Sequence, residues 1–362
     1  MPEQDIRQLS FVEAIREALD QLLDTDPSVM IIGEGVPDPK SIFNSTAGLQ
    51  NKYGAHRVFD MPLAENGLTG VCIGAAMSGM RPVMIHQRID FALLAMDQIV
   101  NNAAKWHYMF DGKSKIPLVI RMIVGRGWGQ GPQHSQSLQA MFASVPGLKV
   151  VMPTTAADAK GMMIAAVEDN NPVIFIEHRW LHHVTDLVPQ GIYRTPIGKA
   201  RLLHSGDDVT VAAFSYMSLE ALAAAKALKQ YLGISVDLLD MRTVRPLDIP
   251  PVITSVEKTG RLLVADTAFK TGSVAGELIS QIAETAFGAL KKAPVRIASP
   301  DHPVPTSPFM SAEYYPGPRQ IAEAIIDLVG ADRQTNGYVL LGESLKSSNL
   351  HDVPNRDFSG PF

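Results

Sequence analysis

Short apolar runs that lack period-two alternation alternate with helical patterns along this chain, and this rhythm constrains the fold more than any other feature. Residues 29–33, 117–124 and 173–176 are runs of this kind. Strands that are covered on both faces, as in a parallel sheet between helices, read as continuous apolar segments. The sequence therefore predicts an α/β protein built on parallel sheets.

The same rhythm predicts two domains. A polar stretch rich in proline and glycine interrupts it at about residues 182–200, and a second α/β series follows. A chain of 362 residues is long enough for two domains with sizeable cores. We expect a first domain at 1–185, a second at 200–330, and a tail at 331–362. The tail has the polar composition of a disordered segment, and we expect it to pack on a partner subunit.

Composition excludes several classes of partner. The formal net charge is −5 and no long basic run occurs, so nucleic acid and anionic membranes are poor partners. The start of the chain lacks the pattern of a signal peptide, and the longest apolar stretch, residues 68–80, is too short to span a bilayer. Cys72 is the one cysteine and suits the core. We expect a cytoplasmic protein.

Glu65 is the most informative single residue. It lies where an apolar strand, residues 57–60, gives way to a helical pattern, residues 64–78, that is spaced with glycines. An unpaired carboxylate is costly at such a tightly packed junction, and it tends to share a proton with a bound partner. The simpler interpretation is a helix-start carboxylate that interacts with the helix dipole. The motifs around Glu65 favour the role of proton handling on a cofactor.

Several segments, spread over both predicted domains, carry a family resemblance. They are residues 60–67 (DMPLAENG), 131–137 (GPQHSQS), 146–153 (PGLKVVMP), 158–161 (DAKG), 168–173 (EDNNPV), 240–248 (DMRTVRPLD) and 255–260 (SVEKTG). In number, order and spacing they resemble the beta subunit of thiamine-diphosphate-dependent 2-oxoacid dehydrogenases, the first component of pyruvate, branched-chain and acetoin dehydrogenase complexes. The resemblance implies a transketolase-like pyrimidine-binding domain followed by a transketolase C-terminal domain.

The resemblance also implies a set of site residues. Glu65 stands where the family's glutamate hydrogen-bonds the aminopyrimidine ring of thiamine diphosphate. Leu63, Gln87 and Phe91 stand beside the same cofactor. His134 matches the family's active-site histidine, which implies that it stabilises a developing negative charge or guides a lipoyl acceptor.

His134 follows a loop with glycines at 125, 127, 129 and 131. We expect the chain to enter a helix there through Ser135 or Ser137, which would favour negative charge. Without the family context, a histidine on a surface loop is an equally good interpretation. The glycine spacing fits neither the dinucleotide nor the P-loop fingerprint, so we do not interpret the loop as a phosphate site. Trp128 and Arg126 in this loop are candidates for gating the substrate site.

The absence of a Gly-Asp-Gly segment bears on how a cofactor would be held. Thiamine enzymes usually hold the diphosphate through Mg²⁺ with a Gly-Asp-Gly segment and a later asparagine, and no Gly-Asp-Gly occurs in this chain. We therefore expect a separate alpha subunit to hold the diphosphate and Mg²⁺, in an α2β2 heterotetramer. The resemblance implies a lipoyl acyltransferase as a further partner. The resemblance implies no side-chain metal ligands here, only a structural K⁺ on backbone carbonyls near Asp169 and Asn171.

The chain departs from the family at residues 85–91, where relatives carry a glutamate and more aromatic residues. Arg88 and Asp90 pair with each other in the simpler interpretation. In the other, Arg88 binds an anionic group of the substrate through two hydrogen bonds. The identity of the substrate therefore stays open.

Two other functions remain. One is the C-terminal half of a split transketolase-like enzyme that transfers a ketol or acyl unit, which would suit Arg88 and a polar substrate. The other is a scaffold without catalysis. The presence of both Glu65 and His134 argues against the scaffold.

Overall fold

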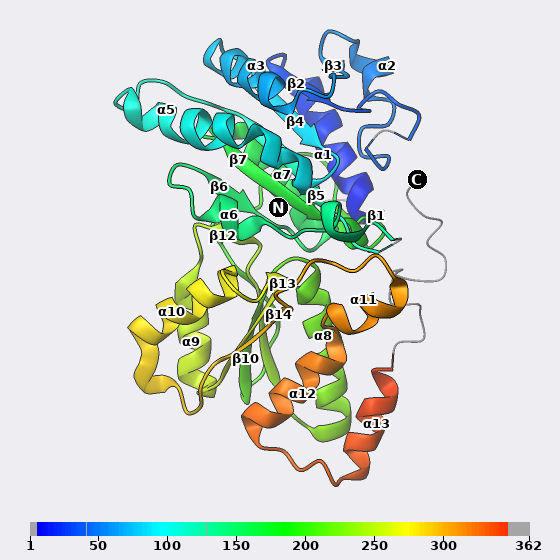
Figure 1. Ribbon diagram of the computed structural model, residues 1–362, viewed down its shortest axis with the longest axis vertical. Coiled ribbons are helices and arrows are strands. Elements are labelled where there is room, and N and C mark those ends of the chain that lie inside the picture. Colours follow the sequence, from blue (N-terminus) through cyan, green and yellow to red (C-terminus); the bar gives the residue numbers. More distant parts are fainter. Residues whose placement is uncertain (1–5, 41, 128, 347–362) are drawn as a thin grey trace. The chain divides into compact units, whose positions relative to one another are not determined.

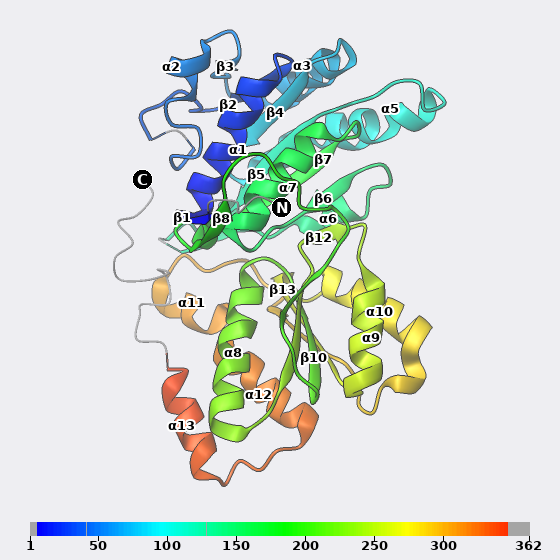
Figure 2. The same ribbon diagram turned by 180° about the vertical axis from the view of Figure 1, so that it is seen from behind.

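The chain folds into two compact α/β units, each with its own parallel-rich sheet (Figures 1 and 2). The computed structural model describes residues 6–40, 42–127 and 129–346. Unit 1 takes the described residues up to Gly125 together with Met141–Ile197, and unit 2 takes Arg126–Ala140 and the described residues from Gly198 onward. The predicted α/β class with parallel sheets is confirmed.

The sheet of unit 1 contains six parallel strands in the order β6-β7-β5-β4-β2-β3. Every residue of β2, β5 and β7 is buried, which explains their largely apolar sequences. A separate antiparallel pair joins β1 to β8. The strands of unit 1 are β1 (Ile6–Ser10), β2 (Val29–Gly33), β3 (Val58–Phe59), β4 (Arg81–His86), β5 (Val119–Val124), β6 (Lys149–Val151), β7 (Val173–His178) and β8 (Thr185–Pro189).

Helices cover both faces of this sheet, with α1 and α7 on one face and α3 and α5 on the other (Figures 1 and 2). The Ser10 hydroxyl accepts a hydrogen bond from Glu13 N, and the Glu13 carboxylate accepts one from Ser10 N. This capping box fixes where α1 begins. The helices around this sheet are α1 (Phe11–Thr25), α2 (Leu49–Tyr53), α3 (Glu65–Met77), α4 (Ile89–Ala92), α5 (Ala104–Met109), α6 (Gln139–Ala143) and α7 (Ala156–Glu168).

The helical segment from Ile89 to Met109 is not one regular helix. It consists of α4, a 3₁₀ turn at Leu93–Ala95, a π-helical turn at Gln98–Ala103 and α5. Ala95, Ile99 and Ala103 are fully buried across these changes. Their spacing keeps one apolar stripe against the core, so the burial pattern is maintained while the backbone hydrogen bonding changes.

The sheet of unit 2 has the order β14-β13-β10-β11-β9, and only β9 is antiparallel to its neighbour. Helices α8 and α12 pack on each other over one apolar core, and α9 packs with α10. The elements are β9 (Arg201–His204), β10 (Val209–Ala213), β11 (Val236–Asp240), β12 (Thr243–Arg245), β13 (Leu262–Phe269), β14 (Val295–Ser299), α8 (Tyr216–Leu232), α9 (Ile249–Thr259), α10 (Val274–Ala286), α11 (Pro308–Tyr314), α12 (Pro318–Val329) and α13 (Asn336–Ser344).

Two segments differ from the sequence-based expectation. The predicted linker at 182–200 contains β8, which is held by main-chain pairing with β1 and has little apolar sequence to reveal it. The start of the polar tail forms α13, whose Leu341 is buried in the core beneath α8. Tyr338 and Leu345 pack against the same core, so these apolar contacts outweigh the polar composition of the tail there. Residues 347–362 of the tail lie outside the described residues.

Candidate active site

The carboxyl ends of β2, β3 and β4 bring polar residues together at one edge of the unit 1 sheet. Glu34 follows β2, Asp60 follows β3 and Gln87 follows β4. Asp60 Oδ1 accepts a hydrogen bond from Gly35 N at 2.8 Å, and Gln87 Nε2 donates to Glu34 O at 2.9 Å. This edge is where open parallel sheets bind their ligands.

Glu65 begins α3 at this edge, and only 7% of it is exposed. Its backbone oxygen accepts from Thr69 Oγ1 at 2.7 Å. Among the residues that the structure describes, no hydrogen-bond donor meets its carboxylate. A largely buried carboxylate in this state can gain a hydrogen-bond donor. An N–H group on a bound molecule would supply it.

Glu34 is a member of this cluster that sequence reasoning missed. Burial raises the pKa of Glu34, and the negative charges of Glu65 and Asp60 raise it further. The available signal was its position directly after a buried parallel strand, the position that Asp60 also has. Three carboxylates therefore share one edge of the sheet.

We expect Glu34→Gln to stabilise the protein, and the gain to grow with pH. The pKa of Glu34 is raised above the ordinary value of 4.5, so its carboxylate form is disfavoured in the folded state as pH rises through the folded pKa. Melting temperatures of wild type and variant should coincide near pH 4 and separate toward about pH 8. A variant that melts below wild type at pH 8 would show that the Glu34 carboxylate is stabilising.

The remaining predicted cofactor residues lie at or near the same edge. Gln87 is exposed, and Phe91 is partly buried within α4. Leu63 is 83% exposed just before α3. Trp128 lies outside the described residues.

Arg88 lies in a cationic cluster with Arg179 as well as close to Asp90. The Arg88 guanidinium lies 5.0 Å from the Phe43 ring centroid, and that of Arg179 lies 4.4 Å from it. Burial lowers the pKa of Arg88 to about 10, against the opposing charge of Asp90. Burial and the charge of Arg88 lower the pKa of Arg179 to about 9. Sequence reasoning missed Phe43 and Arg179 because nothing local connects them to Arg88.

A buried ion cluster lies within the unit 1 core. Arg121 and Glu177 have fully buried side chains and form a two-point ion pair, with Arg121 Nη2 at 2.8 Å from Glu177 Oε2. His182 Nε2 donates to Glu177 Oε2 at 3.0 Å. Burial favours protonation of Glu177, but the charge and hydrogen bonds of Arg121 outweigh it and lower its pKa. Burial lowers the pKa of His182 to about 4, so this histidine is neutral and structural.

His134 belongs to unit 2 and is exposed. It follows a 3₁₀ turn at Gly131–Gln133, and the next helix, α6, begins only at Gln139. The expected helix start at Ser135 or Ser137 is therefore wrong. The side chain of Ser137 bonds to β13 instead of capping a helix, at 2.8 Å from Thr267 Oγ1.

Two residues of the segment before His134, Arg126 and Gly131, contact other residues of unit 2. Gly131 has a φ of +63°, and a Cβ there would lie 2.6 Å from Thr306 Oγ1, so only glycine fits. The Arg126 guanidinium lies 4.1 Å from the Tyr315 ring centroid. Arg126 thus anchors the loop by stacking. A pocket of about 500 Å³ lies beside this segment and is lined by Pro132, Gln133, Gln136, Phe269, Asp301, His302, Pro303 and Val304.

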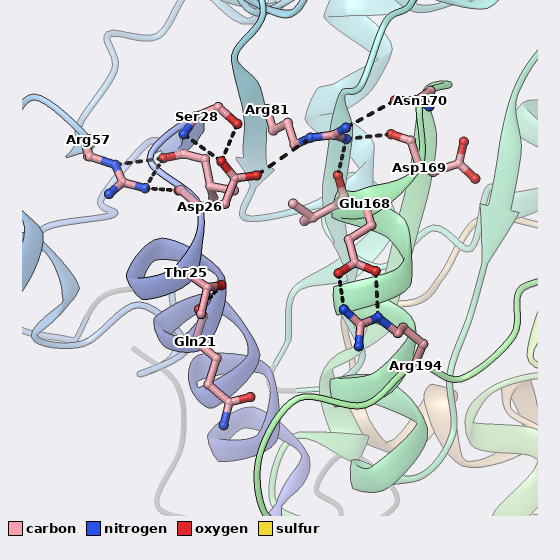
Figure 3. A network of polar contacts seen from close by, with 12 residues as sticks. Gln21, Thr25, Asp26, Ser28, Arg57, Arg81, Glu168, Asp169, Asn170 and Arg194 are labelled. Carbon is pink, nitrogen blue, oxygen red and sulfur yellow. Dashed lines mark hydrogen bonds and ion pairs between the residues drawn. The ribbon is translucent and has the colours of Figure 1, made fainter.

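Arg81 donates hydrogen bonds to the turn after α7, where a K⁺ was expected (Figure 3). Arg81 Nη1 donates to Val167 O at 2.8 Å and to Asp169 O at 3.1 Å, and Nη2 donates to Asn170 Oδ1 at 3.1 Å. Asn171 N donates to Asp169 Oδ1 at 2.9 Å. Among the described residues, no three His, Cys, Asp or Glu side chains gather as metal ligands.

No helix within the described part of the chain is both long and apolar enough to cross a bilayer.

Two protein families match the chain, one in each predicted domain. Residues 7–183 match the transketolase pyrimidine-binding domain, and residues 198–321 match the transketolase C-terminal domain. The beta subunit of acetoin:2,6-dichlorophenolindophenol oxidoreductase from Cupriavidus necator is 43% identical over 88% of this chain and 96% of its own length. The chain belongs to the beta-subunit family of thiamine-dependent 2-oxoacid dehydrogenases.

Other members of this family are similar over most of the chain. The pyruvate dehydrogenase E1 beta subunit of Rhizobium meliloti is 39% identical over 86% of this chain and 68% of its own length. The 2-oxoisovalerate dehydrogenase beta subunit of Bacillus subtilis is 39% identical over 88% of this chain and 98% of its own length. A solved structure described as a split-gene transketolase in an inactive β4 tetramer superposes with a TM-score of 0.73 at 22% identity, covering 89% of this chain and 98% of that one. At that identity it supports the fold alone.

Proposed function

We propose that this chain is the beta subunit of a thiamine-diphosphate-dependent 2-oxoacid dehydrogenase. Its reaction is the oxidative decarboxylation of a 2-oxoacid such as pyruvate, with transfer of the acyl group to a lipoyl group. The buried Glu65 carboxylate, which meets no donor among the described residues, is the single observation that carries the proposal. The relatives that act on pyruvate and 2-oxoisovalerate support the reaction class.

The residues present fit the aminopyrimidine half of the cofactor. Glu65 would accept a hydrogen bond from a ring nitrogen and hold or release a proton there. Gln87, Leu63 and Phe91 would lie beside the ring. When bound, thiamine diphosphate supplies the electron sink for decarboxylation, and the protein contributes orientation and proton control. His134 would donate to negative charge that develops on the substrate.

An alpha subunit would complete the site, in an α2β2 heterotetramer. The chain has no Gly-Asp-Gly segment, so the diphosphate and its Mg²⁺ need ligands from another chain. The exposed face of α3 is apolar and smooth, with Gly67, Gly74, Val71 at 58% and Met77 at 47% exposure. Nearby Leu94 is 64% exposed. Such a face suits close packing of another subunit.

The two domain assignments, 1–185 and 200–330, belong to this proposal. So do the packing of the tail on a partner, a lipoyl acyltransferase as a further partner, a cytoplasmic location, and substrate contacts by Arg88 and Trp128.

Reconstitution tests the proposed function. The chain is produced with the polypeptide from a neighbouring reading frame that carries the missing Gly-Asp-Gly segment, and the complex is supplied with Mg²⁺ and thiamine diphosphate. We expect thiamine-dependent reduction of a dye acceptor with one 2-oxoacid and none with the isolated chain. If the isolated chain binds the cofactor fully and turns substrate over, the proposal is wrong.

Acetoin is a second candidate substrate, because relatives at 43% and 37% identity are named for acetoin:dye oxidoreduction. The same dye assay with pyruvate, 2-oxoisovalerate and acetoin separates the candidates. Ketol transfer between sugars without dye reduction would instead support the split transketolase-like enzyme.

A structural K⁺ near Asp169 and Asn171 is part of the proposal, although Arg81 bonds to this turn. A backbone carbonyl oxygen has two lone pairs, so Asp169 O can accept from Arg81 and still face a cation. We expect a higher melting temperature in KCl than in NaCl at equal ionic strength. Equal melting temperatures in the two salts would argue against the site.

A further inference from the structure

We propose that Gln139 and Asp266 are positioning residues. Their hydrogen bond fixes the direction in which the His134 side chain leaves the backbone. The inference rests on the proposed function, in which His134 touches the substrate. The segment from His134 to Gln139 and the strand β13 both belong to unit 2. Four polar side chains join them: Ser137, Gln139, Asp266 and Thr267.

The donors and acceptors in this cluster admit only one arrangement. Gln139 Nε2 is a donor only, and it meets Asp266 Oδ1 at 2.6 Å and Thr267 Oγ1 at 3.2 Å. Ser137 Oγ donates to Gln139 Oε1 at 2.8 Å. The remaining contact, 2.8 Å between the hydroxyls of Thr267 and Ser137, must then run from Thr267 to Ser137. The three side chains form a closed ring of hydrogen bonds with a fixed direction.

Asp266 anchors this ring to the sheet. It is fully buried, and it also accepts from Ala268 N at 3.2 Å and Ala275 N at 3.4 Å, at the start of α10. Burial raises the pKa of Asp266, while these donors and Gln139 oppose the rise. A fully satisfied buried network of this kind specifies one arrangement of the chain.

The ring determines the orientation of His134 through the alternation of the backbone. Ser135, Ser137, Leu138 and Gln139 are buried, whereas His134 is exposed and Gln136 is intermediate, so burial alternates over residues 134–137. Over the non-helical residues 134–137, a shift of one residue would bury His134 and expose Ser135 and Ser137. Gln139 can pair with Asp266 in only one register of the segment 134–139 along β13. That register presents the imidazole outward, on the side of Gln136 and the pocket that Gln136 lines.

A double-mutant cycle in the reconstituted enzyme tests the proposal. Gln139→Leu keeps the size of the side chain and removes the ring. We expect a loss in kcat of about tenfold with little change in KM. A misplaced imidazole that raises the activation free energy by about 1.4 kcal/mol is sufficient for this loss. In a His134→Gln background the same change should cost nothing further, because its effect acts through His134.

Thr210→Val is the matched control. The Thr210 hydroxyl is also fully buried in unit 2, and it bonds to Ser255 at 2.7 Å and Thr259 at 2.8 Å. This variant should lose stability without changing kcat. If Gln139→Leu does not fold, Thr267→Val opens the same ring with a smaller change.

The outcomes distinguish a failure of the positioning role of Gln139 and Asp266 from a failure of the proposed role of His134. An equal loss in wild-type and His134→Gln backgrounds, or no loss in either, overturns the positioning role alone. Full activity of His134→Gln overturns the proposed role of His134, and the positioning role with it.

Discussion

Glu65→Gln is expected to lower kcat by about 10²- to 10⁴-fold in the reconstituted complex, the range for loss of a general acid–base group. Glutamine has the same shape and can still accept a hydrogen bond, but it cannot hold the proton of the aminopyrimidine. Dye reduction under saturating thiamine diphosphate and 2-oxoacid measures the effect.

The fold should not change in this variant. Glu65 makes no side-chain hydrogen bond to the described residues, and the removal of a buried charge costs the folded state nothing. Glu277→Gln is the control, since Glu277 is an exposed carboxylate in the first turn of α10. Its activity should equal that of wild type. Undiminished turnover by Glu65→Gln would end the catalytic assignment.

Arg121→Met is expected to lower the free energy of unfolding by about 3–5 kcal/mol, the range for removing one partner of a buried ion pair. The substitution leaves Glu177 buried without its cation, and among the described residues the neutral His182 is its remaining side-chain hydrogen-bond partner. Urea unfolding followed by circular dichroism measures the change.

An exposed ion pair of the same geometry provides the control (Figure 3). Arg194 donates to both oxygens of Glu168 at 2.6 and 2.8 Å, and the two side chains are 54% and 43% exposed. Arg194→Met should cost at most about 1 kcal/mol, because solvent screens exposed pairs. The double variant Arg121→Met/Glu177→Leu should recover much of the loss. If Arg121→Met costs no more than Arg194→Met, Glu177 does not depend on Arg121.

Local sequence patterns were sufficient to predict the parallel sheets and to identify Glu65 as a candidate site residue. The strands β2, β5 and β7 were recognisable because burial on both faces favours apolar residues at successive positions, with the paired Arg121 and Glu177 as exceptions. Glu65 was recognisable because the strand and the helix that position it are adjacent in sequence. Glu34 could have been found by the same argument.

Local sequence failed where polar side chains found distant partners. The segment after His134 has serines that suit a helix start, but Ser137 and Gln139 bond to residues about 130 positions later. β8 has few apolar residues, and it exists because β1 offers an edge for pairing.

The sequence by itself determined an α/β chain of two units, a carboxylate at the junction of a strand and a helix, and the absence of a Gly-Asp-Gly segment. Only the tertiary structure decided which charges are neighbours. Arg88 and Arg179 meet at Phe43, and Arg121 meets Glu177 across 56 residues. Apolar periodicity records burial residue by residue, whereas an ion pair or a hydrogen bond depends on a distance in space that no local pattern encodes.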